Sequence, residues 1–177
     1  PLFCNVDSSD FTLHDNSPCV GTGQDGANIG ALGVGCEVYS GPTWYVSTSG
    51  SDSNEGSEGS PFATIQAGID AASDGDTVLV QAGTYSESID LSGKNILVKG
   101  VNSGTTILDG GSSQRLVYLN SAGTTASIKN FTIQNGSATN GAAIYIDNST
   151  FVIDSCIIKS NTGYSSIIHI DSSTVQI

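Results

Sequence analysis

Short runs of alternating apolar and polar residues recur along the second half of the chain, separated by turns rich in Gly, Ser and Asn. In Ile144-Tyr145-Ile146-Asp147 the two isoleucines fall on one side of an extended chain, because successive side chains alternate across a strand. Residues 117–120 and 168–171 repeat this pattern, so Tyr118, Tyr145 and His169 are predicted to face outward. Such runs are typical of strands that bury one face.

The runs return at a nearly constant interval. Ile146 and Ile170 are 24 residues apart, and Ile128 and Ile153 are 25 residues apart. This interval is too long for one hairpin and fits one coil of a solenoid. Because one coil cannot bury its own apolar face, the coils must stack on one another. The sequence therefore predicts an all-β solenoid.

One segment has helical spacing instead. Ile65, Ile69 and Ala72 fall on one helical face, and Thr64 before them is suited to be the N-cap. Residues 73–76 (Ser-Asp-Gly-Asp) end this helix. The first coil of a solenoid exposes apolar side chains and unpaired strand edges, so the helix is predicted to cap that coil.

Composition and charge narrow the class of protein. The 177 residues carry 5 Lys and Arg against 17 Asp and Glu, a net charge of −12, which excludes nucleic acid as an expected partner. The 22 glycines and the absence of Met are typical of an all-β secreted protein with many turns. No apolar run approaches the roughly 20 residues of a transmembrane helix.

Residues 1–40 differ from residues 41–177 and are expected to form a separate part. They contain Cys4, Cys19 and Cys36 and a Gly-rich run, which favours an oxidising, extracellular or cell-surface location. The spacings lack the short pairs of zinc sites. Cys19 with Cys36 is the favoured disulfide, Cys4 is left for another partner, and inert thiols are the alternative.

Several motifs in residues 44–177 resemble the opening of right-handed parallel β-helix domains of the pectin lyase-like superfamily. They are Tyr45-Val46-Ser47, 50–54 (GSDSN), 61–66 (PFATIQ), 75–78 (GDTV) and 82–85 (AGTY). The motifs at 1–4, 10–13, 17–19 and 29–33 resemble the closing segment of a preceding bacterial module. The resemblance implies a right-handed parallel β-helix with a short N-terminal capping helix, preceded by a Cys/Gly-rich irregular segment. We expect a piece of a longer chain with further coils after residue 177.

The catalytic residue sets of that superfamily are not complete in this chain, so no catalytic residue is assigned. Related hydrolases use clustered carboxylates, whereas Asp147, Asp154 and Asp171 are single residues of a repeat. Related lyases use an Arg or Lys base with Ca²⁺, but Arg115 and the lysines lack an evident acidic cluster. The alternative is the N-terminal part of a polysaccharide lyase or hydrolase whose catalytic coils follow residue 177.

The outward row of Tyr118, Tyr145 and His169 is the candidate ligand-binding site. Equivalent residues of adjacent coils lie about 4.8 Å apart, and aromatic rings suit sugar rings as well as plain stacking. Three polar residues would form the rim of a glycan platform: Asn120, Asp147 and Asp171. The negative charge favours a neutral glycan, or an acidic one held through Ca²⁺. The alternative is a row that only covers the sheet.

The acidic loop at 52–58 is the candidate calcium site, with oxygen ligands from Asp52, Asn54, Glu55 and Glu58. A solvated surface loop is the competing interpretation, and no other cofactor is expected. Asn135 and Asn161 are predicted to stack in turns, and Cys156 is predicted to be a buried free thiol. Together these features predict a structural, adhesive or glycan-recognising module.

Overall fold

The computed structural model describes residues 3–5, 10–14, 34–36, 41–121 and 124–177. Contacts divide the chain into two units, Pro1–Tyr39 and Ser40–Ile177. In the first unit, β1 (Phe3–Asn5) pairs antiparallel with β2 (Asp10–His14), and β2 pairs parallel with β3 (Val34–Cys36). The origin of residues 1–40 in a preceding module stays a prediction. The predicted Cys19–Cys36 disulfide is not described, because Cys19 lies outside the described residues.

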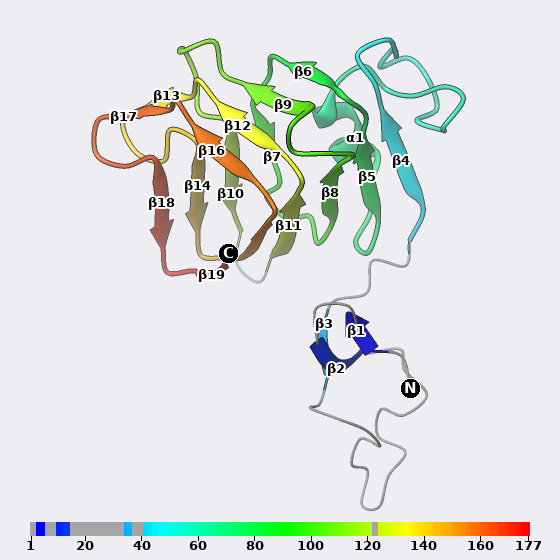
Figure 1. Ribbon diagram of the computed structural model, residues 1–177, viewed down its shortest axis with the longest axis horizontal. Coiled ribbons are helices and arrows are strands. Elements are labelled where there is room, and N and C mark those ends of the chain that lie inside the picture. Colours follow the sequence, from blue (N-terminus) through cyan, green and yellow to red (C-terminus); the bar gives the residue numbers. More distant parts are fainter. Residues whose placement is uncertain (1–2, 6–9, 15–33, 37–40, 122–123) are drawn as a thin grey trace, which may run out of the picture. The chain divides into compact units, whose positions relative to one another are not determined.

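The second unit is a parallel β-solenoid built from three long sheets (Figure 1). Sheet I contains β4 (Thr43–Val46), β5 (Thr77–Val80), β8 (Leu97–Gly100), β11 (Thr125–Lys129), β15 (Thr150–Asp154) and β19 (Thr174–Gln176). Sheet II contains β7 (Ile89–Asp90), β10 (Val117–Asn120), β14 (Ile144–Asp147) and β18 (Ile168–Asp171). Sheet III contains β6 (Gly83–Tyr85), β9 (Thr106–Asp109), β12 (Thr132–Gln134) and β16 (Ile157–Lys159). A short pair, β13 (Ser137–Ala138) and β17 (Thr162–Gly163), lies in the turns.

The register between coils is the one that the sequence repeat predicts. Tyr118 pairs with Tyr145 and Tyr145 with His169 in sheet II, while Ile128 pairs with Ile153 in sheet I. A slip of one residue would turn the apolar side chains outward, so burial of one face fixes this register. The predicted all-β solenoid is confirmed.

The chain bends sharply where sheet I passes into sheet III. Residues 128–133 and 153–158 occupy equivalent positions in neighbouring coils, and each segment divides into two strands near a residue with positive φ. These residues are Asn130, with φ of 61°, and Ser155, with φ of 52°. Short polar residues tolerate this left-handed conformation better than β-branched ones. The bend carries the buried Phe131 into the interior.

A single apolar core runs through the stacked coils. Phe131 and Phe151 are the largest of its fully buried side chains. Ile144 and Ile146 of β14 are also 0% exposed, as the alternation predicts. Burial of each such side chain contributes about 1.5–3 kcal/mol. This continuous core is what holds the outward side chains of each sheet in a fixed array.

The helix α1 (Ile65–Ala71) covers the first coil, as predicted. Thr64 is its N-cap and accepts a hydrogen bond from the N–H of Ala67. Gly68 lies so close to β4 and β5 that an added Cβ would stand 2.8 Å from Cγ1 of Val78. The helix therefore rests directly on the apolar side chains that the first coil would otherwise expose. In the part of the chain that the structure describes, no helix is long and apolar enough to span a membrane.

Candidate functional site

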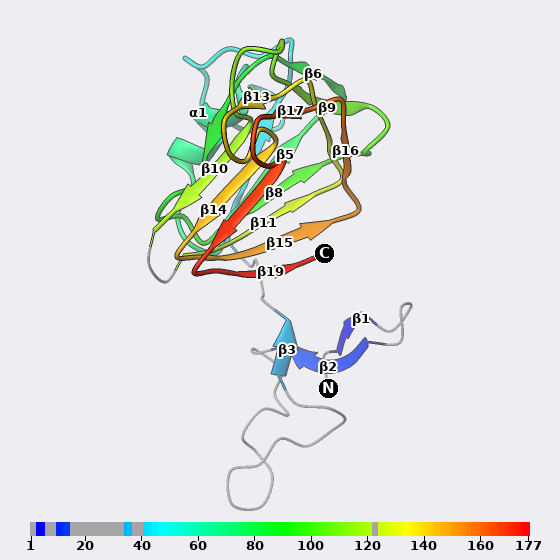
Figure 2. The same cartoon turned by 90° about the vertical axis from the view of Figure 1, so that its left-hand side faces the viewer.

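The aromatic row, defined as Tyr118, Tyr145 and His169, lies on the outer face of sheet II. Strands β10, β14 and β18 run side by side there (Figure 2). Each ring is half-buried, whereas the flanking Val117, Leu119, Ile144 and Ile146 are fully buried. The strand alternation thus presents one ring per coil at the surface.

The three rings are stacked along the solenoid axis. The centroids of Tyr118 and Tyr145 are 5.3 Å apart with planes inclined by 21°, and those of Tyr145 and His169 are 4.6 Å apart and inclined by 19°. Both faces of Tyr145 are therefore occupied by its neighbours. The row offers ring edges, with phenol hydroxyls and imidazole nitrogens, rather than a flat platform of ring faces.

Arg115 is a member of this site that sequence reasoning missed. Its guanidinium carbon lies 4.4 Å from the centroid of the Tyr145 ring and 5.5 Å from that of Tyr118. Nε donates to the carbonyl of Gly141 at 3.2 Å, and Nη2 donates to the carbonyl of Asn140 at 2.8 Å. Arg115 is the chain's only arginine and precedes a tyrosine-bearing strand, which was the available signal.

The predicted rim residues do lie together beside the row. Asn120, Asp147 and Asp171 are paired in register across the three strands. Nδ2 of Asn120 donates to the hydroxyl of Tyr118 at 3.1 Å, which joins rim and row. Carboxylates in register repel each other, so the Asp147 and Asp171 pair is not explained by stability. The row is thus flanked on one side by the Arg115 guanidinium, which precedes β10, and on the other by the carboxylates of Asp147 and Asp171 at the ends of β14 and β18.

The predicted calcium ligands are not brought together. Both oxygens of Asp52 accept hydrogen bonds from Thr64 or Ala63 at the start of α1, and Asn54 donates to the carbonyl of Pro61. Burial raises the pKa of Asp52, but the three hydrogen bonds outweigh it and hold that pKa below its usual value. Glu55 and Glu58 are exposed. The described residues contain no cluster of three His, Cys, Asp or Glu that could hold a metal ion, so calcium binding stays a prediction.

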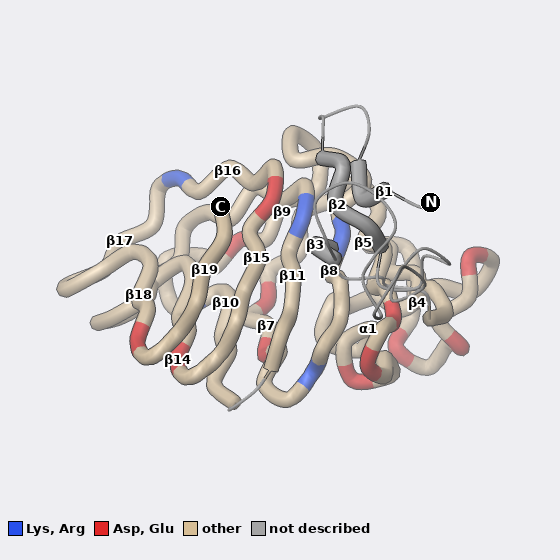
Figure 3. Tube along the Cα trace, turned by 90° about the horizontal axis from the view of Figure 1, so that it is seen from below, with Lys and Arg blue, Asp and Glu red and all other residues tan. Residues whose placement is uncertain are grey.

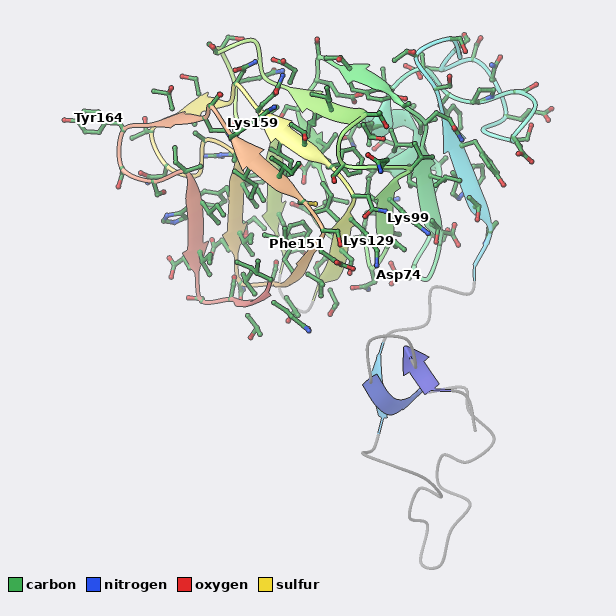
Figure 4. The ribbon with its side chains drawn as sticks, in the orientation of Figure 1. Asp74, Lys99, Lys129, Phe151, Lys159 and Tyr164 are labelled. Carbon is green, nitrogen blue, oxygen red and sulfur yellow. The ribbon has the colours of Figure 1, made fainter. Side chains whose placement is uncertain are left out.

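Two lysines form a second charged feature, on the outer face of sheet I. Lys99 and Lys129 are paired in register on β8 and β11 (Figures 3 and 4). Nζ of Lys129 forms an ion pair with Asp154 at 2.5 Å, with side chains 39% and 44% exposed. At that exposure such a pair contributes little to stability. Lys159 lies apart from them on β16 in sheet III.

The remaining predicted residues have structural roles. The side chain of Asn161 bridges two coils, accepting from the N–H of Gly136 and donating to the carbonyl of Ile133. Asn135, with φ of 56°, donates to the carboxylate of Asp109. Cys156 is free and half-buried, and burial raises the pKa of its thiol, so its reactive thiolate is disfavoured.

Comparisons with known proteins agree with this architecture. Residues 44–176 match the family model described as "Pel9A-like, right handed beta helix region". A Bacillus subtilis (strain 168) protein, "Uncharacterized protein YwoF", is 34% identical over 87 residues, which is 46% of this chain. The chain spans about 19% of the length of that curated relative. No solved structure matches the chain significantly.

Proposed function

The chain belongs to the Pel9A-like right-handed β-helix family, and from that premise we propose that it is a glycan-recognising module of a secreted or cell-surface protein. The aromatic row and its rim are the proposed binding site. The bound polymer lies along the solenoid axis, with successive sugar residues over successive coils.

The observation that carries this proposal is the composition of one continuous strip of surface. Three aromatic edges recur coil by coil and are flanked by amide and carboxylate groups in the same register. Aromatic side chains with polar tips bind well where one side of a ligand is apolar and its edge is hydroxylated. A sugar polymer has both properties and repeats at a regular spacing, as the coils do.

The charge of the surface favours a neutral glycan. The chain has a net charge of −12, and Asp147 and Asp171 lie directly beside the row. An acidic polymer would be repelled unless a cation such as Ca²⁺ lay between the charges. The carboxylates suit hydroxyl groups instead, because ionised Asp accepts hydrogen bonds and donates none.

Removal of the central ring tests the proposal. Tyr145→Ala should weaken binding of neutral polysaccharides by about tenfold, because it removes the hydroxyl at the centre of the row, and one hydrogen bond contributes about 0.5–1.5 kcal/mol. Binding is measured by titration calorimetry, with and without Ca²⁺, and circular dichroism checks the fold. Tyr164→Ala is the matched control, since Tyr164 is 94% exposed in a turn (Figure 4). If wild-type protein binds no neutral or Ca²⁺-dependent glycan, the proposal is wrong.

A second candidate is that the chain is the N-terminal part of a polysaccharide lyase or hydrolase. The observation that favours it is the lysine pair Lys99–Lys129 beside Asp154, an unusual gathering of cations in an acidic protein. Incubation of the full-length protein with polygalacturonate and with neutral polymers distinguishes the two candidates. Release of unsaturated or reducing ends would favour the enzyme. Binding without product would favour the recognition module.

A further inference from the structure

Arg115 joins two segments that meet only in the folded chain. It precedes β10, while Asn140 and Gly141 precede β14 in the next coil. Its two hydrogen bonds to their carbonyls, at 2.8 and 3.2 Å, fix the plane of the guanidinium. A planar fork held at two points has little rotational freedom left.

The same guanidinium is in contact with two rings of the aromatic row. It lies 4.4 Å from the ring centroid of Tyr145 and 5.5 Å from that of Tyr118. A cation within about 6 Å of an aromatic ring is attracted by about 0.5–2 kcal/mol, depending on its exposure. In the described residues no carboxylate is ion-paired with Arg115, so the rings and carbonyls are its partners.

We propose that Arg115 is the positioning residue of the aromatic row: it connects the Tyr118 and Tyr145 rings to the 140–141 turn and thereby holds the row in its stacked arrangement. The consequence for glycan affinity rests on the proposed function, whereas the consequence for ring geometry does not. A row that is ordered before binding loses less conformational entropy when a ligand arrives.

Two substitutions separate the charge from the geometry. Arg115→Met keeps much of the side-chain length but removes the charge and the donors. Arg115→Lys keeps the charge but replaces the planar fork with a point charge that cannot reproduce both fixed hydrogen bonds. Lys159→Met is the control, because it removes a cation from sheet III, away from the row.

The first readout is ring geometry in the full chain without ligand. Stacking shifts the ring-proton NMR signals of Tyr145 and His169 upfield, and Arg115→Met should bring them back toward free-residue positions. Arg115→Lys should retain at most part of the upfield shift seen in wild-type protein. Lys159→Met should leave the upfield shift unchanged. Retained stacking shifts in Arg115→Met would overturn the inference. If that variant does not fold, Arg115→Lys decides: loss of the shifts in a folded protein supports the inference, and full retention overturns it.

The second readout is glycan affinity. Arg115→Met should raise the Kd of the polysaccharide that wild-type protein binds by about tenfold, because the side chains of the row must then be ordered when the ligand binds. If the ring shifts are lost but the Kd is unchanged, the inference that Arg115 positions the row for glycan binding is overturned. Absence of glycan binding by wild-type protein would overturn the proposed function alone, since the ring shifts are measured without ligand.

Discussion

The carboxylate of Glu87 accepts a hydrogen bond from the backbone N–H of Ile65 at 2.8 Å, across 22 residues of sequence. Its other oxygen accepts from the N–H of Gln66 at 3.0 Å. These two N–H groups lie in the first turn of α1, where no intrahelical acceptor exists. Glu87 therefore ties the capping helix to the coil that follows it, a role that its position in the sequence does not reveal.

Stability should depend on the ionisation of Glu87. Burial raises the pKa of Glu87, the two hydrogen bonds partly offset this, and the nearby Asp52 charge raises it further. A group whose pKa is raised on folding stabilises the protein fully below its unfolded pKa, and that stabilisation is lost as pH rises through the folded pKa. Glu87→Gln should remove this decline from the free energy of unfolding measured by urea titration at several pH values. Glu58→Gln, at an exposed site, should leave the decline of the unfolding free energy with pH unchanged. An identical decline in both variants would contradict the assignment of this pH dependence to Glu87.

Thr106→Val should stabilise the protein. Oγ1 of Thr106 is buried and has no hydrogen-bond partner in the described part of the chain, and the residue is 0% exposed. Valine has nearly the same shape without the unsatisfied hydroxyl, so a gain of about 1 kcal/mol is expected in chemical denaturation. The exposed Thr84→Val on the adjacent strand should change little. A loss of stability in Thr106→Val would show that a partner for the hydroxyl exists.

Asn161→Ala should destabilise the solenoid by about 2 kcal/mol, because it removes two hydrogen bonds between coils and leaves the buried N–H of Gly136 without its acceptor. Thermal unfolding followed by circular dichroism measures the loss. Asn140→Ala is the control, since Asn140 contributes its backbone carbonyl, which alanine retains. Equal melting temperatures for the two variants would argue against a bridging role for Asn161.

Gly68→Ala should destabilise the cap in spite of the better helix propensity of alanine. The propensity gain is about 1 kcal/mol, but the new Cβ would meet Val78 at 2.8 Å and Val46 at 3.0 Å, and overpacking of this kind costs about 1–3 kcal/mol. Gly59→Ala, which enters open space, should leave the urea midpoint unchanged. A stabilised Gly68→Ala variant would mean that α1 can move off the first coil.

The predicted Cys19–Cys36 disulfide has a direct chemical test. Closing a loop of 17 residues should stabilise that segment by about 3 kcal/mol. Mass spectrometry of a non-reduced digest of secreted protein should find the two peptides joined. Free thiols at both positions would rule the bond out.

The sequence by itself determined the fold and the register of its repeats. The alternation in 144–147 and the interval of 24 residues between Ile146 and Ile170 are properties of the chain, and burial of one face leaves a single way to stack them. The alignment of Tyr118, Tyr145 and His169 follows from that register alone. The sequence also predicted the capping helix, because an N-cap residue and helical spacing of apolar residues are local signals.

Only the tertiary structure decided which side chains meet between those strands. The Arg115 guanidinium lies over the Tyr145 ring, and the carboxylates of Asp52 and Glu87 accept hydrogen bonds from backbone N–H groups at the start of α1. Each of these contacts depends on how turns of irregular length fold back onto the coils. The turns do not follow the periodic pattern of the strands. Their polar groups form hydrogen bonds with the partners that lie nearby once the coils have packed. In the aromatic row the rings stack face to face, so the surface offers ring edges. The periodic sequence thus determined where each aromatic side chain lies, and the neighbouring side chains determined how each ring is oriented.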